Sequence, residues 1–383
     1  MRKIAVITGI RADYGILYPI LKEIENRKNA SLQLIVAGAH LSHEFGYTIG
    51  EIEKDGFKIA AKVDMLLSDD TGARMARSLG VGILEFAQVF EMIEPDITIV
   101  LGDREEMLAA AIASLCINIP VAHIHGGEVG TGGHIDESIR HALTKFSHLH
   151  FAATQKSAQR IMKLGEEKWR VHYVGAPFID NIALNKITQP SMLIKKYNLD
   201  LKQPLIVVVQ HPLAIDAANS RKQMEETMKA VAFFKLPTLV VYPNVDAGGK
   251  DIIDVIKKYE KYSYITAYKN LPSADYLGLL KVASVLVGNS SSAILEAPTF
   301  HLPAVNIGSR QLGREMAKNI ISVPYDEKAI QKAIKKALFD KKFQSVVKEC
   351  KSAYEASNVS KKIVDILSAI DIDDTLLHKI MTF

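Results

Sequence analysis

One stretch of the sequence brings acidic side chains, histidines and glycines close together. Asp103 follows the apolar run 97–101, and His125 and Glu128 follow the next apolar run. Asp136 comes just after a glycine-rich segment. Carboxylates and imidazoles can move protons to and from a substrate, and glycines let a ligand approach the backbone closely. The pattern therefore predicts an acid–base site that contains Asp103, His125, Glu128 and Asp136.

These residues also have structural interpretations. Asp103 stands near the start of a predicted helix, where N-capping by itself explains an Asp, and Arg104 next to it is expected in a surface ion pair. His123 and His125 share one face of a predicted strand and could bind a metal ion together with Asp136. Strand histidines more often satisfy polar groups of the core, and no HExxH or clustered Cys/His set is present. We therefore expect neither a catalytic metal nor another cofactor.

A second group of residues is of the kind that binds phosphate. Residues 288–292, Gly-Asn-Ser-Ser-Ser, follow an apolar run and precede a predicted helix centred near Ala293, so that amides, hydroxyls and the helix dipole converge on one point. Glu296 lies at most about two helical turns after the start of this predicted helix and could accept hydrogen bonds from a ribose diol. Arg11, close to a glycine at another helix start, could hold a phosphate as well. A serine-rich N-cap, a buried glutamate and a surface arginine are the structural alternatives.

Composition narrows the class of protein. The chain has 383 residues, 48% hydrophobic and 23% charged, which is typical of a soluble globular protein with about two domains. The net charge of +4 does not indicate a nucleic-acid partner. The first glycine turn, residues 8–15, has neither a GxGxxG fingerprint nor the lysine of a P-loop. Lysines late in the chain fall at helical spacing and predict a solvated helix face: Lys328, Lys332, Lys335, Lys336, Lys341 and Lys342.

The sequence also indicates a compartment. Cys116 and Cys350 lie far apart and neither is in a CxxC pair, which favours a reducing cytoplasm. A strand begins at once, leaving no room for a signal peptide. The most apolar stretch, residues 107–124, is broken by polar residues and a proline, so we expect no membrane partner.

Alternating apolar runs and amphipathic segments predict two doubly wound α/β domains with parallel sheets. Strands are expected at residues 4–8, 32–37, 97–101, 120–124, 150–153, 171–174, 205–209, 238–242, 264–267, 285–287 and 304–307. The predicted domains are 1–178, with the acids, and 200–360, with the phosphate turn. A last helix, 361–383, is expected to pack back on the first domain. In open parallel sheets ligands bind beyond the carboxyl ends of the strands, where these motifs lie.

Six segments together resemble a known family over essentially the whole chain. They are residues 8–15, 102–104, 123–128, 136–141, 288–292 and 306–311. In order and spacing they resemble the hydrolysing UDP-N-acetylglucosamine 2-epimerases of sialic acid biosynthesis. The resemblance implies a glycosyltransferase-B-like pair of Rossmann-like domains facing a cleft, a UDP-sugar as substrate and a homodimer or homotetramer.

The resemblance also assigns roles to residues. It implies that Asp103 and Asp136 are catalytic acids. Some members carry Glu where this chain has His125, which leaves two candidates for the third acid–base role. One is His125, because histidine titrates near neutral pH, and the other is Glu128. The implied diphosphate-binding residues are Ser290, Ser291 and Arg11. Glu296 is implied for the ribose and main chain near Leu271 for the uracil. Further implied substrate-binding residues are Ala12, Arg104, His211, Asn244 and Arg310.

The activity that the resemblance implies is conversion of UDP-N-acetylglucosamine into N-acetylmannosamine and UDP. Elimination through 2-acetamidoglucal, followed by addition of water, avoids the need to acidify C2–H and requires no NAD. A sister activity on UDP-2,4-diacetamido-2,4,6-trideoxyglucose, for legionaminic acid, needs the same machinery. A glycosyltransferase and a non-catalytic UDP-sugar-binding protein are the remaining alternatives.

Overall fold

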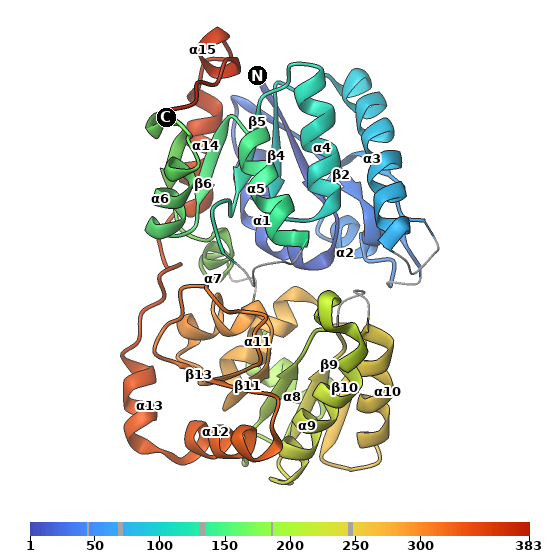
Figure 1. Ribbon diagram of the computed structural model, residues 1–383, viewed down its shortest axis with the longest axis vertical. Helices are drawn as coiled ribbons and strands as arrows, with labels where there is room; N and C mark the ends of the chain where they lie inside the picture. Colours follow the sequence, from blue (N-terminus) through green and yellow to red (C-terminus); the bar gives the residue numbers. More distant parts are fainter. Residues whose placement is uncertain (44–45, 68–71, 130–134, 185–186, 244–247) are drawn as a thin grey trace. The chain divides into compact units, whose positions relative to one another are not determined.

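The chain divides into two compact units, each built on its own parallel sheet. The computed structural model describes residues 1–43, 46–67, 72–129, 135–184, 187–243 and 248–383 (Figure 1). The first unit comprises Met1–Val129, Ile135–Asn185 and Ala356–Phe383, and the second includes Lys186–Glu355. The second unit thus begins before residue 200, because helix α8 (Pro190–Tyr197) packs Leu193 and Tyr197 into its core.

Seven strands form the sheet of the first unit, in the order β3-β2-β1-β4-β5-β6-β7. They are β1 (Arg2–Thr8), β2 (Ala30–Ala37), β3 (Ile59–Val63), β4 (Ile97–Leu101), β5 (Val121–Ile124), β6 (Leu149–Ala152) and β7 (Val171–Tyr173). All neighbouring strands are parallel. Six of the seven match the apolar runs in the sequence. Strand β3 was not predicted, because this edge strand is only partly buried and lacks a continuous apolar run.

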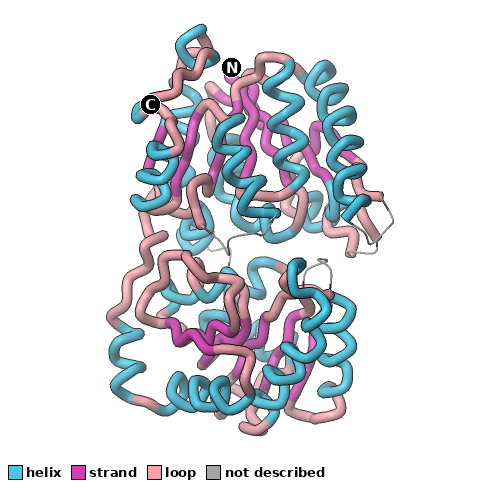
Figure 2. The backbone as a smooth tube through the Cα atoms, in the orientation of Figure 1, coloured by secondary structure: helices cyan, strands magenta, loops and turns pink. Residues whose placement is uncertain are grey.

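Helices cover both faces of this sheet, as Figure 2 shows. Alternate residues of β1 point to opposite faces, so Ile4 and Val6 pack with α1 (Arg11–Glu25), α2 (Ile49–Lys54) and α14 (Val359–Ala369). Ala5 and Ile7 pack on the other face with α3 (Gly72–Ile93), α4 (Glu105–Cys116) and α5 (Ile135–Phe146). The doubly wound architecture expected from the sequence is therefore confirmed.

The C-terminal segment belongs to the first unit. Helix α14 lies against α1, and α15 (Asp374–Leu377) follows it. Arg170 is fully buried and donates hydrogen bonds to the carbonyl groups of Leu376 and Thr375, each at 2.7 Å. Glu166 binds Lys379 at 2.7 Å. Residues far apart in the sequence thus fasten the end of the chain to α6 (Gln155–Lys163) and β7 and their connections.

Six parallel strands form the sheet of the second unit, in the order β10-β9-β8-β11-β12-β13. They are β8 (Ile206–Val209), β9 (Thr238–Val241), β10 (Ile265–Tyr268), β11 (Val285–Gly288), β12 (Ala304–Ile307) and β13 (Ile320–Val323). Five were expected. The edge strand β13 was missed, since it pairs only with β12 and is incompletely buried.

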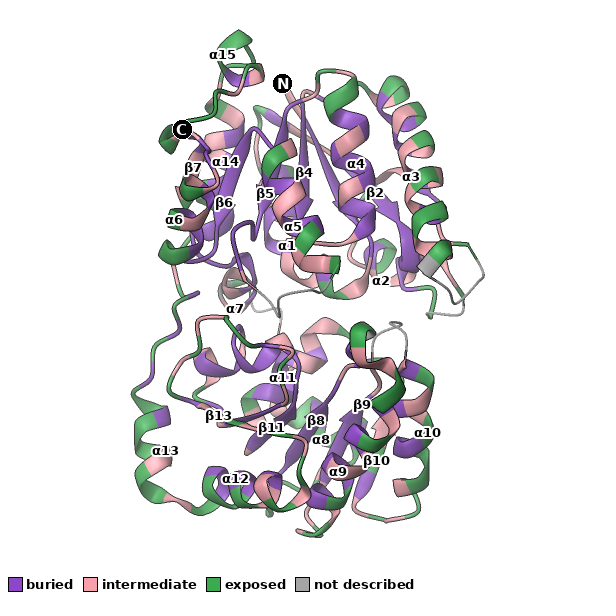
Figure 3. Ribbon diagram, viewed as in Figure 1, coloured by how far each residue is buried: buried purple, intermediate pink, exposed green. Residues whose placement is uncertain are grey.

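The sheet of the second unit is also covered on both faces. Helices α9 (Ser220–Ala232), α10 (Gly249–Tyr259) and α12 (Glu327–Phe339) pack on one face, and α8 and α11 (Ser273–Val282) on the other. The six late lysines of α12 and of α13 (Lys341–Lys348) are exposed, while Ile330, Ile334 and Leu338 between them are buried (Figure 3). The predicted solvated helix face is confirmed.

Two smaller sequence expectations also bear on the fold. Both cysteines are free, Cys116 exposed and Cys350 buried. Among the described helices, which also include α7 (Asp180–Ala183), none has the length and apolar character needed to cross a lipid bilayer.

Candidate functional site

The carboxyl ends of β1, β4 and β5 carry most of the chemical groups of the first unit. The order of its strands reverses between β1 and β4, which is where ligands bind in open parallel sheets. Gly9 follows β1, Gly102 to Arg104 follow β4, and His125 follows β5. The first turn of α5 brings Asp136 and Glu137 to the same group of loops through Arg140.

Arg140 joins the acidic residues of this site. Its guanidinium is almost fully buried and contacts Oδ2 of Asp103, and Nη1 lies 3.2 Å from Oε2 of Glu137. Nη1 also donates to the carbonyl oxygen of Glu128 at 3.4 Å. One cation therefore fixes Asp103 from the β4 loop, Glu137 from α5 and the backbone of the β5 loop. Asp136 lies one residue before Glu137, half-buried in the first turn of α5.

This arrangement corrects the capping interpretation of Asp103. The N-cap of α4 is Arg104, which makes no capping hydrogen bond through its side chain, and Asp103 contacts Arg140 instead. The surface ion pair expected for Arg104 is also wrong, since Nε of Arg104 donates to Glu106, a fully buried residue, at 3.1 Å. The first expectation failed because Arg140 is distant from Asp103 in the sequence, and the second because Glu106, although close to Arg104 in the sequence, is buried.

His125 and Glu128 form a close pair in the loop after β5. Nδ1 of His125 lies 3.0 Å from Oε1 of Glu128, and both residues are buried. Nε2 of His125 has no hydrogen-bond partner in the described part of the chain. A carboxylate this close to an imidazole places two groups that can transfer protons side by side.

The metal pair considered for His123 and His125 is not formed. Strand β5 ends at Ile124 and His125 has a positive φ of 64°, so the two imidazoles do not share a strand face. Nε2 of His123 instead donates to the carbonyl oxygen of Gly102 at 2.7 Å, which is the core-satisfying role. Burial lowers the pKa of His123 to about 3, so that it is neutral. Within the described ranges, no group of three or more His, Cys, Asp or Glu residues is arranged to hold a metal ion.

The glycine turn after β1 places Arg11 and Ala12 at the start of α1. Nη1 of Arg11 lies 3.9 Å from Glu51, and the Arg11 side chain is 20% exposed. Arg104 is at the neighbouring strand end, after β4. Two guanidinium groups thus lie near adjacent strand ends, as expected for an anion site.

The serine-rich segment of the second unit forms a tight turn after β11. The α-helix predicted near Ala293 is wrong, because the segment folds into two short 3₁₀ turns, Ser291–Ala293 and Ala297–Phe300. Oγ of Ser290 accepts the Ser292 N–H at 3.3 Å. The helix dipole invoked for this turn is therefore absent, which leaves hydroxyls and amides as the groups of the turn that could bind an anion. Glu296, half-buried, precedes the second 3₁₀ turn.

Asn289 holds this turn against its neighbours. Its side chain accepts the N–H of His211 at 2.7 Å and donates to the carbonyl oxygen of His211 at 2.8 Å. Its carbonyl oxygen accepts hydrogen bonds from Arg310 at 3.4 Å and Gln311 at 2.8 Å. The loops after β8, β11 and β12 are thereby brought together, with His211, Ser290 and Arg310 in one group.

The remaining predicted residues of the second unit are less closely connected to this group. Burial, with Arg310 nearby, lowers the pKa of His211 to about 3, so its ring is neutral. Leu271 is buried just before α11, and Ser291 is half-buried at the start of the first 3₁₀ turn. Asn244 lies outside the described residues.

Sequence reasoning missed the residues that organise both groups. Arg140 and Asn289 stand inside the quoted motifs, but neither received a role. The available signal for Arg140 was its spacing of three from Glu137 on a helix, which suits an ion pair. Asn289 carried no signal, because its partners His211, Arg310 and Gln311 are distant in sequence.

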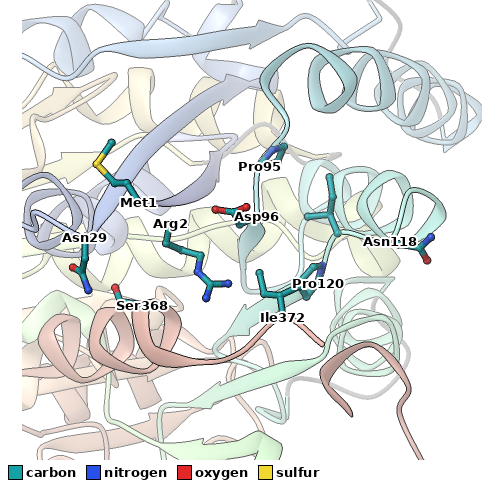
Figure 4. Close-up of a pocket in the computed structure, with 10 residues that line it drawn as sticks. Met1, Arg2, Asn29, Pro95, Asp96, Asn118, Pro120, Ser368 and Ile372 are labelled. Carbon is teal, nitrogen blue, oxygen red and sulfur yellow. The ribbon is translucent and has the colours of Figure 1, made fainter. Parts of the chain in front are cut away.

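A pocket of about 780 Å³ lies at the opposite end of the first sheet (Figure 4). Its lining includes Arg2, Asp96 and Pro120, which stand at or before the starts of β1, β4 and β5. Because ligands of parallel sheets bind at the carboxyl ends, this pocket is separate from the candidate site.

Comparison with known proteins agrees with the resemblance seen in the sequence. A family model described as UDP-N-acetylglucosamine 2-epimerase matches residues 22–368. A Legionella pneumophila protein named UDP-N,N'-diacetylbacillosamine 2-epimerase (hydrolyzing) is 35% identical over 99% of both chains. A Campylobacter jejuni protein named GDP/UDP-N,N'-diacetylbacillosamine 2-epimerase (hydrolyzing) is 37% identical over 99% of this chain and 98% of its own.

A solved structure supports the fold. The Neisseria meningitidis UDP-GlcNAc 2-epimerase bound to UDP-GlcNAc matches with a TM-score of 0.82 and 17% identity, covering 96% of this chain and 99% of that one. The glycosyltransferase-B-like fold expected from the sequence is thereby confirmed.

Proposed function

Because this chain belongs to the UDP-N-acetylglucosamine 2-epimerase family, we propose that it hydrolyses a nucleoside-diphosphate sugar with inversion at C2. The observation that carries the proposal is the full-length similarity to two relatives whose names specify a hydrolysing 2-epimerase. The acid–base groups gathered around Arg140 and His125 support it, since proton transfer at C2 requires such groups.

The favoured substrate is UDP-N,N'-diacetylbacillosamine, which is UDP-2,4-diacetamido-2,4,6-trideoxyglucose. Both relatives carry this sugar in their names, and this supports the diacetamido substrate over the UDP-N-acetylglucosamine that the sequence analysis put first. UDP-N-acetylglucosamine is the second candidate, because the description of the family model specifies it. One relative's name also includes a GDP-sugar, so the nucleotide has to be tested as well as the sugar.

The proposed reaction has two steps. In the first, a base removes the proton from C2, a C1–C2 double bond forms, and the C1–O bond to the nucleotide breaks, which releases UDP. In the second, water supplies a hydroxyl group to C1 and a proton to the opposite face of C2. The net products are UDP and the free 2-epimer, and no redox cofactor takes part.

Asp103 is proposed as the base in this scheme. Arg140 compensates its charge and holds it in place, while Glu137 and the Glu128 backbone fix Arg140 in turn. His125, which lies next to Glu128, and Asp136 are proposed as the groups that return a proton at C2 and assist the departing oxygen. A positioned acid or base typically contributes about 10²–10⁴-fold to the rate.

Ser290, Ser291 and Arg310 are proposed as phosphate-binding residues of the second unit, and Arg11 and Arg104 as phosphate-binding residues of the first. Hydroxyls and amides of the serine turn supply neutral donors, and the guanidinium groups supply charge. The ribose role proposed for Glu296, the uracil contact near Leu271 and the positions of Ala12, His211 and Asn244 near UDP rest on the family resemblance alone.

Gly288→Ala tests the role of the serine turn. Gly288 has φ +132°, and a Cβ at this position would lie 2.0 Å from the carbonyl oxygen of Val209. The backbone must shift at a cost of about 1–3 kcal/mol, and the turn shifts with it. We expect UDP affinity, measured by calorimetry, to fall about tenfold or more.

Gly80→Ala is the matched control for Gly288→Ala. A Cβ at Gly80 meets no atom within 4 Å, so UDP affinity is expected to stay unchanged. A Gly288→Ala variant that folds and binds UDP as tightly as the wild type would remove the serine turn from the proposed site.

The substrate is tested by incubating the protein with four nucleotide sugars and identifying the free sugar by NMR. These are the UDP and GDP derivatives of N,N'-diacetylbacillosamine and of N-acetylglucosamine. We expect kcat/KM for UDP-N,N'-diacetylbacillosamine to exceed that for UDP-N-acetylglucosamine by about tenfold or more, since a site that hydrogen-bonds a second acetamido group discriminates against a substrate that carries a hydroxyl there. The reverse preference would favour the second candidate, and release of UDP only with an added acceptor would indicate a glycosyltransferase.

A further inference from the structure

Two buried carboxyl groups near the switch point of the first sheet have no role in the proposed reaction. Asp13 lies in the first turn of α1 and is 8% exposed, and Glu106 lies in the first turn of α4 and is fully buried. The two helices follow β1 and β4, which are neighbours in the sheet. Carboxylates are rarely buried unless they are paired, so each needs an account of its charge.

The contacts of Glu106 are those of a carboxylate that faces a cation. Its Oε2 accepts a hydrogen bond from Nε of Arg104 at 3.1 Å. The rest of the carboxyl group fills the space beside two glycines, because a Cβ at Gly9 or Gly38 would come within 2.8 or 2.4 Å of it. Its other oxygen, Oε1, is buried and has no hydrogen-bond partner within the described residues. Glu106 thus has a fixed position and one unused acceptor.

Asp13 also has a buried carboxyl oxygen without a hydrogen-bond partner among the described residues. The backbone N–H groups of Gly9 and Ile10 donate to its carboxyl group, but Oδ2 is buried without a hydrogen-bond partner among the residues described. Burial, and to a smaller extent the charge of Glu106, raise the pKa of Asp13 to about 7, although Arg104 acts in the opposite direction. A carboxyl group in this state retains its proton in mildly acidic solution.

The surrounding charges do not supply another partner for this proton. His40 lies nearby, where burial lowers the pKa of its ring to about 4, and its two nitrogens bond Thr8 and Thr48 at 2.9 and 2.7 Å. Arg11, in the same turn of α1, is a cation and can only donate. Among the described residues around Asp13, the carboxylate with an oxygen that lacks a hydrogen-bond partner is that of Glu106.

We propose that Asp13 is protonated in the native protein and donates its proton to Oε1 of Glu106, and that this pair positions the Gly9–Arg11 turn against Arg104. One hydrogen bond then satisfies both unused oxygens, and a bond of this kind, between a neutral acid and a carboxylate, is among the stronger ones. The pair carries one negative charge, which lies next to the cation of Arg104. Asp13 is a positioning residue, since it is not required to touch the substrate.

The effect on ligand binding rests on the proposed function. Loss of the proton gives Asp13 and Glu106 a second negative charge at the strand ends where the diphosphate is proposed to bind. UDP affinity is therefore expected to fall as pH rises through about 7, by up to about tenfold per pH unit, which is the limit for one linked proton. Asp13→Asn places an amide donor next to Glu106 at every pH, so its UDP affinity should not show this decline.

The protonation itself is tested by stability, without any ligand. Between about pH 4 and pH 7 the native protein holds a proton that the unfolded chain has released, so the wild type loses stability as pH rises. Histidines also titrate in this range, and the comparison with Asp13→Asn cancels their contribution. The ratio of the unfolding equilibrium constants, wild type to Asp13→Asn, should rise about tenfold per pH unit over this window and then become constant.

Two further variants sharpen the test. Asp96→Asn is the control. In the wild type Asp96 accepts the Lys3 N–H at 2.7 Å at the other end of the sheet, so the unfolding equilibrium constant of this variant should keep the pH dependence of the wild type. Glu106→Gln removes a neighbouring charge that raises the Asp13 pKa. In this variant the pH above which stability no longer falls on account of Asp13 should therefore be lower than in the wild type. A constant ratio between wild type and Asp13→Asn across pH 4–8 would overturn the protonation.

The two halves of the proposal can fail separately. If the ratio changes as expected but UDP affinity declines with pH equally in wild type and Asp13→Asn, the pair is structural and has no role in binding. If the wild type binds no UDP, the proposed function fails, while the stability comparison still decides whether Asp13 carries the proton.

Discussion

Asp103→Asn is expected to lower kcat for release of the free sugar by about 10²–10⁴-fold while leaving KM within about threefold. Asparagine has nearly the shape of aspartate and can still accept from Arg140, but it cannot remove a proton from C2. The interactions that hold the nucleotide are assigned to other residues, so ground-state binding persists. The measurement is steady-state kinetics of UDP release, together with UDP affinity by calorimetry.

Glu137→Gln is the comparison variant for Asp103→Asn. Glu137 shares Arg140 with Asp103, at 3.2 Å from Nη1, but has no proton-transfer role in the scheme. Its loss weakens the support of Arg140 and is expected to lower kcat less than about tenfold. Unfolding curves of both variants separate loss of catalysis from loss of fold. Near-normal turnover in a folded Asp103→Asn variant would refute the assignment of Asp103 as the base.

Arg170→Met is expected to destabilise the first unit by about 2–5 kcal/mol, because buried carbonyl groups lose their charged donor and each such group costs about 1–3 kcal/mol when it is left unsatisfied. The Arg170 side chain is 1% exposed and binds Glu167 at 2.6 Å. It also donates to the carbonyl oxygens of residues 148, 375, 376 and 378. Methionine fills much of the same volume but leaves these acceptors without their donor, so the C-terminal segment loses its attachment.

The chain offers a local probe and a control for this prediction. Trp169 is the single tryptophan, and the Arg170 guanidinium lies 4.2 Å from the centroid of its ring, so tryptophan fluorescence reports on this part of the unit during denaturation. Arg27→Met is the control, because Arg27 also binds the C-terminal segment, through Asp365 at 2.6 Å, but its side chain is 24% exposed. A partly exposed pair contributes about 1 kcal/mol or less. Equal losses of stability in the two variants would contradict the role given to Arg170.

The sequence predicted the strands well where burial made them apolar throughout. The central strands β1, β4, β8 and β11 are buried and read as continuous apolar runs, whereas the edge strands β3 and β13 do not. The serine turn was interpreted as a helix start because local composition does not distinguish an N-cap from a 3₁₀ turn. Local pattern thus predicts elements that are buried on both faces and fails at edges and turns.

For the candidate site too, local sequence predicted some residues and not others. The residues at the strand ends were found because topology places them there, so Asp103, His125 and Ser290 needed only the strand assignment. Their partners were not found. Arg140 reaches Asp103 across 37 positions and Asn289 reaches His211 across 78, and neither separation leaves a local signal. The positive φ of His125, which keeps this residue from sharing a strand face with His123, is likewise set by the loop and not by the strand pattern.

The central claim, that UDP leaves by elimination with proton exchange at C2, is tested most directly by running the reaction in D₂O and recording the NMR spectrum of the products. The account predicts UDP and a free sugar that has the manno configuration and carries deuterium at C2. A free sugar that keeps the gluco configuration and its original C2 hydrogen would contradict the account, because hydrolysis would then have proceeded without removing the C2 proton.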